Sequence, residues 1–402
     1  MLKAVGRILN IAVVLGFVIL GVLLFVIPLA TTLLLKFGFN FDQSTRWWLD
    51  VFQQAQYPAM LVFVISWVFF VGGCFASFLN VVAWRVPRGK SILGSSHCPQ
   101  CNIKLKFPQN NVPILGWLRN GGRCANCNLP IPVRYLFAEL ILGSTFLILF
   151  AAMMLTDGAT IPFRPLAQFG NILLDPQIDV LVTLGFHLTI LSVIFTLAIA
   201  ATEKFTAPTS IVIFGIVAAI GFHAVPFTQG IADFRFGNWE NGTRVVGSGQ
   251  FLKLLSNPKD FGIAVGIGCA AAVLSFLAIR YSGNQKCPGV FASLLLIGIC
   301  FGWQAVVSIT VFFLLISVFL HTDACSRIFL ATLVHLCLWR LQTDCQWWPG
   351  PASGLQQLLS GLVFVGVLAS LQWFMTSRSV AEQQNDLHST QNDLPRADST
   401  LE

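Results

Sequence analysis

Hydrophobic residues in this chain form long uninterrupted runs, and short polar segments separate them. A helix that crosses the ~30 Å hydrocarbon core of a bilayer needs about 20 apolar residues. Three weaker and shorter spans are predicted close together, at 289–303, 305–321 and 325–341, and one of them is a candidate for a tilted or re-entrant segment. Seven longer runs are predicted to cross a membrane: 9–35, 58–83, 135–155, 179–201, 209–227, 261–280 and 355–376.

The composition supports a membrane protein. Of the 402 residues, 55% are hydrophobic and only 10% are charged, whereas an average soluble domain has roughly 25% charged residues. So few charges exclude an ordinary cytosolic enzyme, because they could not cover its surface. We therefore predict an all-α fold, a polytopic integral membrane helical bundle of about eight to ten spans. The first run follows Lys3 and Arg7 and is too long for a cleaved signal, so we interpret it as an uncleaved anchor.

Positive charge is concentrated in the loop from Arg85 to Arg134, which holds eight Lys or Arg residues and no Asp or Glu. Basic loops face the cytoplasm, so this loop is predicted to be cytoplasmic, with both termini on the same side. Alternating spans then place loops 36–57, 156–178 and 228–258 outside. An anionic inner leaflet explains the positive charge, and no nucleic-acid partner is predicted. The polar tail 379–402 is predicted to be disordered.

Four of the 11 cysteines form two C-x2-C pairs within the basic loop, with 22 residues between the pairs: Cys98, Cys101, Cys124 and Cys127. This spacing is close to that of a zinc ribbon, in which two such pairs supply four thiolates to one tetrahedral ion. Neighbouring Lys and Arg side chains are expected to favour the thiolate form. A four-thiolate site leaves no open position for water, so a structural role is preferred to metal catalysis.

Two alternatives bear on this site. A loop closed by disulfides would require the opposite membrane topology, because the cytoplasm is reducing. His97 adjoins Cys98 and could replace one ligand, but with four cysteines present it is expected to be a bystander. The histidines in apolar runs, His187, His223 and His335, are interpreted as hydrogen-bonded interior residues.

Motifs surround the cysteine pairs in a fixed order. Phe75–Gly89 reads FASFLNVVAWRVPRG, Asn111–Leu118 reads NVPILGWL, and Ile131–Leu140 reads IPVRYLFAEL. In this order and at this spacing, about 70 residues strongly resemble the amino-terminal domain of the type IV prepilin leader peptidase/N-methyltransferase family. A weaker similarity in span order and length continues to about residue 320.

The resemblance implies a function and a location. Members are bifunctional enzymes of the bacterial inner membrane, in type IV pilus and type II secretion systems. They cut a short basic leader from prepilins on the cytoplasmic side and methylate the new amino terminus with S-adenosylmethionine. The resemblance thus implies pilin-like precursors as partners and S-adenosylmethionine as a cofactor. The expected domains are an anchor with an outer loop (1–57), the amino-terminal domain (58–155, zinc loop 85–134), a degenerate aspartic peptidase-like membrane domain (156–320), additional spans (321–378) and the tail (379–402).

The chain departs from the family at its peptidase residues. The family uses two aspartates, one to activate water and a protonated partner to polarise the peptide carbonyl. The first family motif aligns with Ala200–Thr209, where Ala201 stands at the aspartate position. Counting back from Gly302–Ala305, which reads GWQA, places Val290 at the second aspartate position. Because neither side chain can bind a proton, we predict that the aspartic peptidase activity is lost and that the chain is a pseudoenzyme in this respect.

Few carboxylates could replace that pair. Glu203 and Asp323 are weak candidates and are interpreted as solvated charges at the interface. Glu139 lies just inside a span, where local pairing with Arg134 or a structural or methylation role shared with the family is expected. Three hypotheses result: a family member without peptidase activity that binds or scaffolds pilin-like proteins; an enzyme that is a methyltransferase alone or a peptidase with relocated carboxylates; and a zinc-binding membrane module.

Overall fold

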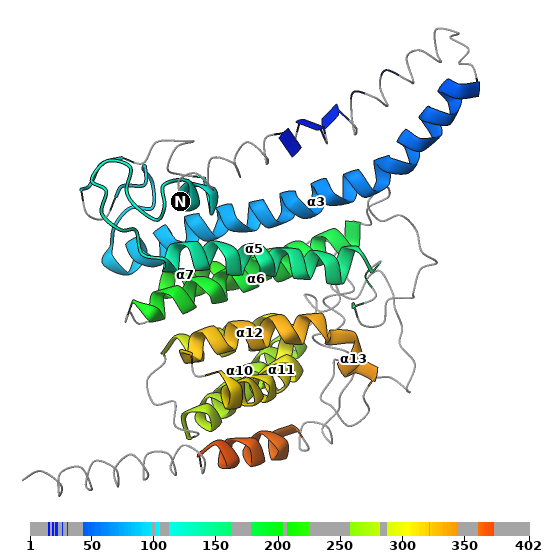
Figure 1. The fold of residues 1–402 in the computed structure, drawn as a ribbon. Coiled ribbons are helices and arrows are strands. Elements are labelled where there is room, and N and C mark those ends of the chain that lie inside the picture. Colours follow the sequence, from blue (N-terminus) through cyan, green and yellow to red (C-terminus); the bar gives the residue numbers. More distant parts are fainter. Residues whose placement is uncertain are drawn as a thin grey trace, which may run out of the picture. The chain divides into compact units, whose positions relative to one another are not determined.

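The computed structural model of the chain is helical (Figure 1). Within its described part there is no strand, only two isolated bridges, and the predicted all-α class is confirmed. The predicted anchor 9–35, apart from isolated positions, and the tail 379–402 lie outside the described residues. These are 43–98, 101–104, 112–156, 178–203, 207–224, 258–281, 288–320, 322–344 and 361–373, with isolated positions within 15–30 and 158–161.

The chain divides into two compact units. Unit 1 comprises Met1–Ala159 and Arg164–Glu203, and unit 2 comprises Thr160–Phe163 and Lys204–Glu402. The main division therefore follows the helix that ends at Thr202, whereas the expected domain boundary lay at 155/156.

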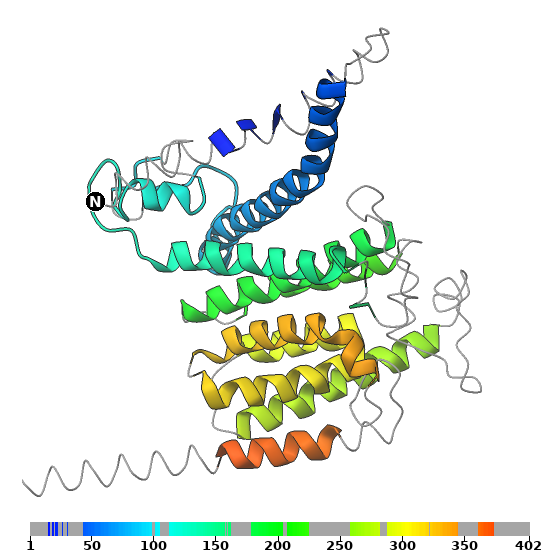
Figure 2. The same ribbon diagram turned by 45° about the vertical axis from the view of Figure 1, so that its right-hand side comes forward.

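Unit 1 is built on three long helices. These are α3 (Gln43–Arg85), which continues into the 3-10 turn η2 (Val86–Arg88), α5 (Arg134–Met154) and α6 (Ile178–Thr202). Each of the three packs against the other two, as Figure 2 shows for α5 and α6. The short helix α4 (Leu115–Arg119) belongs to the loop between α3 and α5.

Glycines allow α3 and α5 to approach closely. A Cβ at Gly72 would lie 2.9 Å from Gly143 Cα, and a Cβ at Gly143 would lie 2.9 Å from the Phe69 carbonyl oxygen. Small residues bring membrane helices together in this way, since apolar side chains gain little by leaving lipid. Phe75 and Phe146 pack beside this crossing, with ring centroids 5.6 Å apart.

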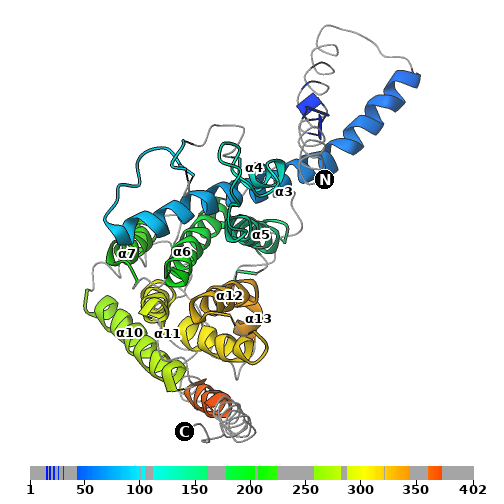
Figure 3. The same cartoon turned by 60° about the vertical axis from the view of Figure 1, so that its left-hand side comes forward.

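Unit 2 contains α7 (Thr209–Ala224), α10 (Pro258–Tyr281), α11 (Pro288–Phe319), α12 (Ala324–Cys337) and α13 (Trp339–Asp344). Helix α11 contacts α7, α10 and α12 and so forms the centre of this unit (Figure 3). Gly268 of α10 and Gly298 of α11 lie so close that a Cβ on either would overlap the backbone of the other.

Helix α11 is broken at Gly302, whose φ of 81° and ψ of 178° are not helical. A Cβ at Gly298 would lie 3.4 Å from Val306 Cγ2, although eight residues of continuous helix span about 12 Å. The chain therefore bends sharply here. The two arms of α11 correspond to the separately predicted segments 289–303 and 305–321.

Three helices of unit 2 share a buried polar network. Ser308 Oγ in α11 donates to Gln342 Oε1 in α13 at 2.7 Å, and His335 Nδ1 in α12 lies 3.1 Å from Ser308 Oγ. Gln342 Nε2 donates to the His335 carbonyl at 3.1 Å. The prediction that His335 is a hydrogen-bonded interior residue is confirmed.

By length and composition alone, four helices in the described part could cross a membrane: Pro58–Arg88, Arg134–Met154, Val180–Thr202 and Gly289–Phe319. The last of these is the helix that is broken at Gly302. Four shorter apolar helices, Thr209–Ala219, Gly266–Tyr281, Ala324–Cys337 and Gly361–Trp373, match the remaining predicted runs that the structure describes.

The start of the predicted span 58–83 agrees with the candidate span Pro58–Arg88, but the outer loop predicted before it is largely helical. Helix α3 begins at Gln43, so much of the loop expected at 36–57 is helical, and Pro58 lies inside the helix rather than at its start. Membrane helices tolerate an internal proline more readily than soluble helices do, because neighbouring groups can satisfy the backbone groups that proline leaves unpaired.

Candidate metal centre

Two short turns of the same design present the four cysteines. In the first, the Cys98 amide donates to the Ile103 carbonyl and the Asn102 amide donates to the Cys98 carbonyl, both at 2.9 Å. The second repeats this pattern with Cys124, Asn128 and Leu129, at 3.0 and 2.9 Å. Each turn closes on an asparagine in the left-handed region, with φ of 56° at Asn102 and 57° at Asn128.

The two turns bring the cysteine sulfurs into one cluster. All four Sγ atoms lie within 4.8 Å of one another. Cys98 Sγ is 3.9 Å from Cys127 Sγ, and Cys101 Sγ is 3.9 Å from Cys124 Sγ. Four Zn–S bonds of 2.3 Å in a tetrahedron would separate the sulfurs by about 3.8 Å. The cluster therefore fits a tetrahedral metal ion, as the spacing of the cysteines predicts.

Backbone amide groups change the pKa values of the cysteine thiols. Hydrogen bonds from the backbone at Cys127 and Asn126 lower the pKa of Cys124 to about 6. The backbone at Ile103 likewise lowers the pKa of Cys101. The pKa of Cys127 is instead raised to about 11, because burial and the neighbouring cysteines outweigh its backbone hydrogen bond at Leu129. The sequence predicted lowered values from flanking cations, whereas the first causes of the lowered values at Cys101 and Cys124 are backbone donors. Thiolates are the form that binds a metal, so these turns prepare the site for one.

His97 does not join the cluster. Its backbone forms an isolated bridge with Lys104, and its side chain is exposed. The four-cysteine group is the ligand set found among the described residues, and it does not include this histidine. The expectation that His97 is a bystander agrees with this arrangement.

The second turn is packed onto α4 by Trp117. Gly122, with φ of 69°, lies under the indole, and a Cβ there would meet Trp117 Cζ2 at 2.6 Å. Trp117 Nε1 donates to the Ile131 carbonyl at 3.2 Å, and the Ile131 amide donates back to the Gly122 carbonyl at 2.7 Å. One tryptophan thus connects the cysteine turn to the short helix.

Glu139 holds the start of α4 against α5. Its side chain is 8% exposed, and Oε2 accepts a 2.6 Å hydrogen bond from the amide of Ile114, the residue before α4. The expectation that Glu139 pairs locally with Arg134 is wrong, because Arg134 pairs with Glu203 instead. The hydrogen bond to Ile114 is consistent with the structural alternative, and the methylation alternative stays a prediction.

The two weak catalytic candidates have structural partners. Glu203 forms ion pairs with Arg88, at 3.7 Å, and with Arg134, and its side chain is 17% exposed. Asp323 caps α12, where Oδ2 accepts from the Ser326 amide at 2.9 Å and Oδ1 from Ser326 Oγ at 2.7 Å. Such a cap satisfies a helix amide that would otherwise lack a partner.

Apolar side chains occupy the two positions at which the resemblance predicts the missing aspartates. Val290 lies in the first turn of α11 and is fully buried, and Ala201 is half-buried near the end of α6. Neither residue supplies a group that can exchange a proton, and their roles in any reaction stay a prediction.

Comparison with known proteins identifies the domain that carries the cluster. Residues 61–153 match the family model described as the bacterial peptidase A24 N-terminal domain. This segment covers most of α3, all four clustered cysteines and nearly all of α5. The chain therefore carries a domain similar to the N-terminal domain of the bacterial A24 peptidases.

Named relatives are similar over the same region. A Myxococcus xanthus prepilin leader peptidase/N-methyltransferase is 32% identical over 179 residues, which are 44% of each chain. An Escherichia coli type 4 prepilin-like proteins leader peptide-processing enzyme is 35% identical over 119 residues, 25% of this chain and 42% of its own. A Bacillus subtilis prepilin leader peptidase/N-methyltransferase is 28% identical over 228 residues, 54% of this chain and 87% of its own.

The match to the first two relatives is partial, since it spans less than half of the length of each. No solved structure matches the chain. The similarity to the A24 N-terminal domain and the four long apolar helices together indicate a membrane protein.

Sequence reasoning missed several residues that build the site. Asn102 and Asn128 close the two cysteine turns, and the repeated pattern C-x2-C-N could have revealed them. Ile114 and Trp117 lie in a motif that was noticed, but their contacts depend on the three-dimensional packing of the loop.

Proposed function

We propose that this chain is a prepilin leader peptidase/N-methyltransferase-like protein that binds type IV pilin-like precursors but has lost aspartic peptidase activity. One contrast carries the proposal. The A24 N-terminal domain keeps its complete four-cysteine cluster, while Ala201 and Val290 occupy the aligned aspartate positions. A chain that retained the whole reaction would need two carboxyl groups there.

The partners of the remaining carboxylates argue against a relocated pair. Two arginines neutralise Glu203, and Asp323 accepts two hydrogen bonds at the start of α12. A general base needs a free lone pair directed at water, and its partner must hold a proton. Both candidates are better suited to holding helix ends.

Zinc is the metal that we propose for the cluster, with the loop in the cytoplasm and the spans in the bacterial inner membrane. Four thiolates favour zinc over hard cations such as magnesium. The ion would hold the loop in shape and would provide no reactive position, because all four ligands come from the protein. The basic, carboxylate-free segment from Arg85 to Arg134 supports the cytoplasmic side.

Methyl transfer is the second candidate function. The names of two relatives above include N-methyltransferase, and such a transfer does not require two aspartates. S-adenosylmethionine would be the methyl donor. This activity would leave the precursor uncut or act on an amino terminus that another enzyme has exposed.

The decisive experiment restores the missing acids. The purified protein in detergent is mixed with a prepilin, and binding, leader removal and transfer of a labelled methyl group are measured. We expect binding without cleavage. The double variant Ala201→Asp/Val290→Asp is expected to regain cleavage, while each single variant stays inactive, because the mechanism needs both carboxyl groups.

The outcomes separate the hypotheses. The proposal would be refuted if the unaltered protein cleaved the prepilin and Glu203→Ala or Asp323→Ala abolished that cleavage. This result would favour relocated carboxylates. Labelled methyl transfer without cleavage would select the methyltransferase. No binding of any prepilin, together with an intact metal centre, would leave only a zinc-binding membrane module.

A further inference from the structure

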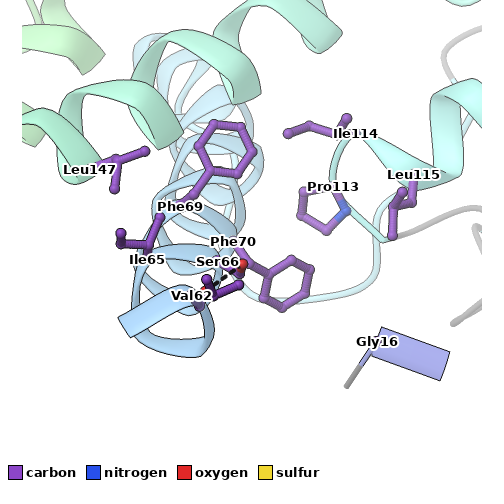
Figure 4. Close-up of a pocket in the computed structure, with 10 residues that line it drawn as sticks. All are labelled: Gly16, Val62, Ile65, Ser66, Phe69, Phe70, Pro113, Ile114, Leu115 and Leu147. Carbon is purple, nitrogen blue, oxygen red and sulfur yellow. Dashed lines mark hydrogen bonds between the residues drawn. The ribbon is translucent and has the colours of Figure 1, made fainter. Parts of the chain in front are cut away.

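An apolar cavity of about 520 Å³ lies between the cysteine loop and α3. Three consecutive loop residues, Pro113, Ile114 and Leu115, form one wall, and Leu147 of α5 contributes as well. Figure 4 shows Pro113, Ile114 and Leu115 on one side of the cavity, across from Phe69 and Phe70 of α3. The α3 residues that line the cavity are Val62, Ile65, Ser66, Phe69 and Phe70. The loop that carries the cysteines therefore also determines the shape of this cavity.

The middle residue of this wall has an unfavourable backbone conformation. Ile114 has φ of 61° and ψ of −56°, a region that β-branched residues avoid. Such a conformation is unfavourable and persists only where surrounding contacts enforce it. The Ile114 amide points at Glu139 and donates to its carboxyl group at 2.6 Å.

Glu139 has an unusual place in the molecule. It lies inside a candidate membrane span, where acidic side chains are costly and usually have a task. Its hydrogen bond to Ile114 reaches the loop at the start of α4 without passing through any cysteine. Gly73 of α3 lies next to this contact, since a Cβ there would be 3.6 Å from Pro113 and 3.8 Å from the Ile114 side chain.

We propose that Glu139 is a positioning residue that docks the cysteine loop on α3 and α5 and holds the loop wall of the cavity, independently of the metal. The metal and its ligands order the two cysteine turns. The Glu139 carboxyl group orders the segment 112–119, which Trp117 connects to the second turn. Two separate interactions thus hold the loop: the metal site formed by the four cysteines, and the hydrogen bond from Ile114 to the Glu139 carboxyl group.

Hydrogen–deuterium exchange of peptides that cover 112–119 tests this separation, with metal content measured on the same samples. In the purified protein in detergent, we expect chelation of the metal to accelerate exchange in the cysteine turns while 112–119 stays protected. Glu139→Leu is expected to accelerate exchange in 112–119 by about tenfold or more, because losing a buried hydrogen-bond acceptor changes the opening equilibrium by at least that factor. Its metal content should remain unchanged.

Two further variants make the result specific. Glu139→Gln keeps an oxygen acceptor and should restore protection to within about threefold of the unaltered protein, since its amide oxygen can still accept from a backbone N–H. Thr145→Val is the matched control, because Thr145 is also a buried polar residue of α5, but its hydroxyl donates to Ile141 of its own helix. It should leave 112–119 unchanged.

The proposal is overturned if 112–119 loses protection on chelation alone, if Glu139→Leu leaves its exchange unchanged, or if Thr145→Val exposes it equally. It is also overturned if Glu139→Leu releases the metal, since the two supports would then be one. None of these measurements depends on binding or processing of a pilin-like precursor, so this inference and the proposed function can fail separately.

Discussion

Arg134, the first residue of α5, is ion-paired with Glu203, which follows the end of α6 by one residue. Arg88 at the end of η2 reaches the same carboxylate at 3.7 Å. One acidic side chain therefore joins the ends of the three long helices of unit 1. This is the position at which the resemblance to the A24 family had suggested acid chemistry.

Replacing Glu203 should weaken this junction. We expect Glu203→Gln to lower the free energy of unfolding by about 1 kcal/mol, because Arg88 and Arg134 lose their shared counter-charge, and the effect should shrink at high salt. Thermal unfolding in detergent at two salt concentrations measures it, and Arg134→Gln combined with Glu203→Gln gives the coupling. Equal stabilities at low salt would show that the ion pairs contribute nothing.

Removal of one sulfur ligand should empty the metal centre. Cys98→Ser is expected to reduce bound zinc from one ion per chain to near zero, since three thiolates and a hydroxyl form a much weaker site. Elemental analysis of the purified variant measures this loss. Cys269→Ser, which alters a cysteine outside the cluster, is the control. Retention of a full equivalent of zinc in Cys98→Ser would contradict the assignment of the ligands.

The glycine beneath Trp117 should be essential to the shape of the loop. Gly122→Ala forces a Cβ into the indole and also requires a left-handed alanine, so we expect a cost of about 2–3 kcal/mol and weaker zinc binding in chelator competition. Gly89→Ala is a matched control with φ of +64° and open space around its Cβ. It should cost only about 1 kcal/mol and leave zinc affinity unchanged. Similar effects of the two substitutions would argue against the Trp117 contact.

The polar network of unit 2 should be vulnerable at Gln342. Gln342→Leu removes the acceptor of the Ser308 hydroxyl and the donor to the His335 carbonyl in a buried site, and we expect a loss of about 1–3 kcal/mol. Denaturant titration of unit 2 tryptophan fluorescence measures it. Thr310→Val provides the comparison, because its hydroxyl donates within its own helix, to Val306, and its loss should matter less. A larger loss of stability in Thr310→Val than in Gln342→Leu would show that the polar network does not stabilise unit 2.

The sequence predicts the helical class and the cysteine cluster because both depend on local patterns. Long apolar runs indicate helices that face lipid. The two C-x2-C pairs indicate a metal site, and this indication does not depend on the rest of the fold. The partners of Glu139 and Glu203 were not predictable in the same way. Ile114 lies 25 residues from Glu139, and Arg134 lies 69 residues from Glu203, so only packing brings each pair together.

Pro58 shows a different limit. A proline at the start of an apolar run is usually taken as a helix boundary, yet α3 begins 15 residues earlier, at Gln43. The backbone groups that proline leaves unpaired can be compensated within a bundle, and sequence patterns do not record this compensation.

The break at Gly302 has a consequence for membrane topology. Because α11 turns sharply at this residue, its arms of 14 and 17 residues are each shorter than the roughly 30 Å hydrocarbon core. A chain that enters the bilayer at residue 288 and reverses midway leaves through the leaflet by which it entered. Reporter domains inserted before and after α11 should then be found on the same side of the membrane. The 32 residues of α11 would add no net crossing, so the orientation of the helices that follow would not change.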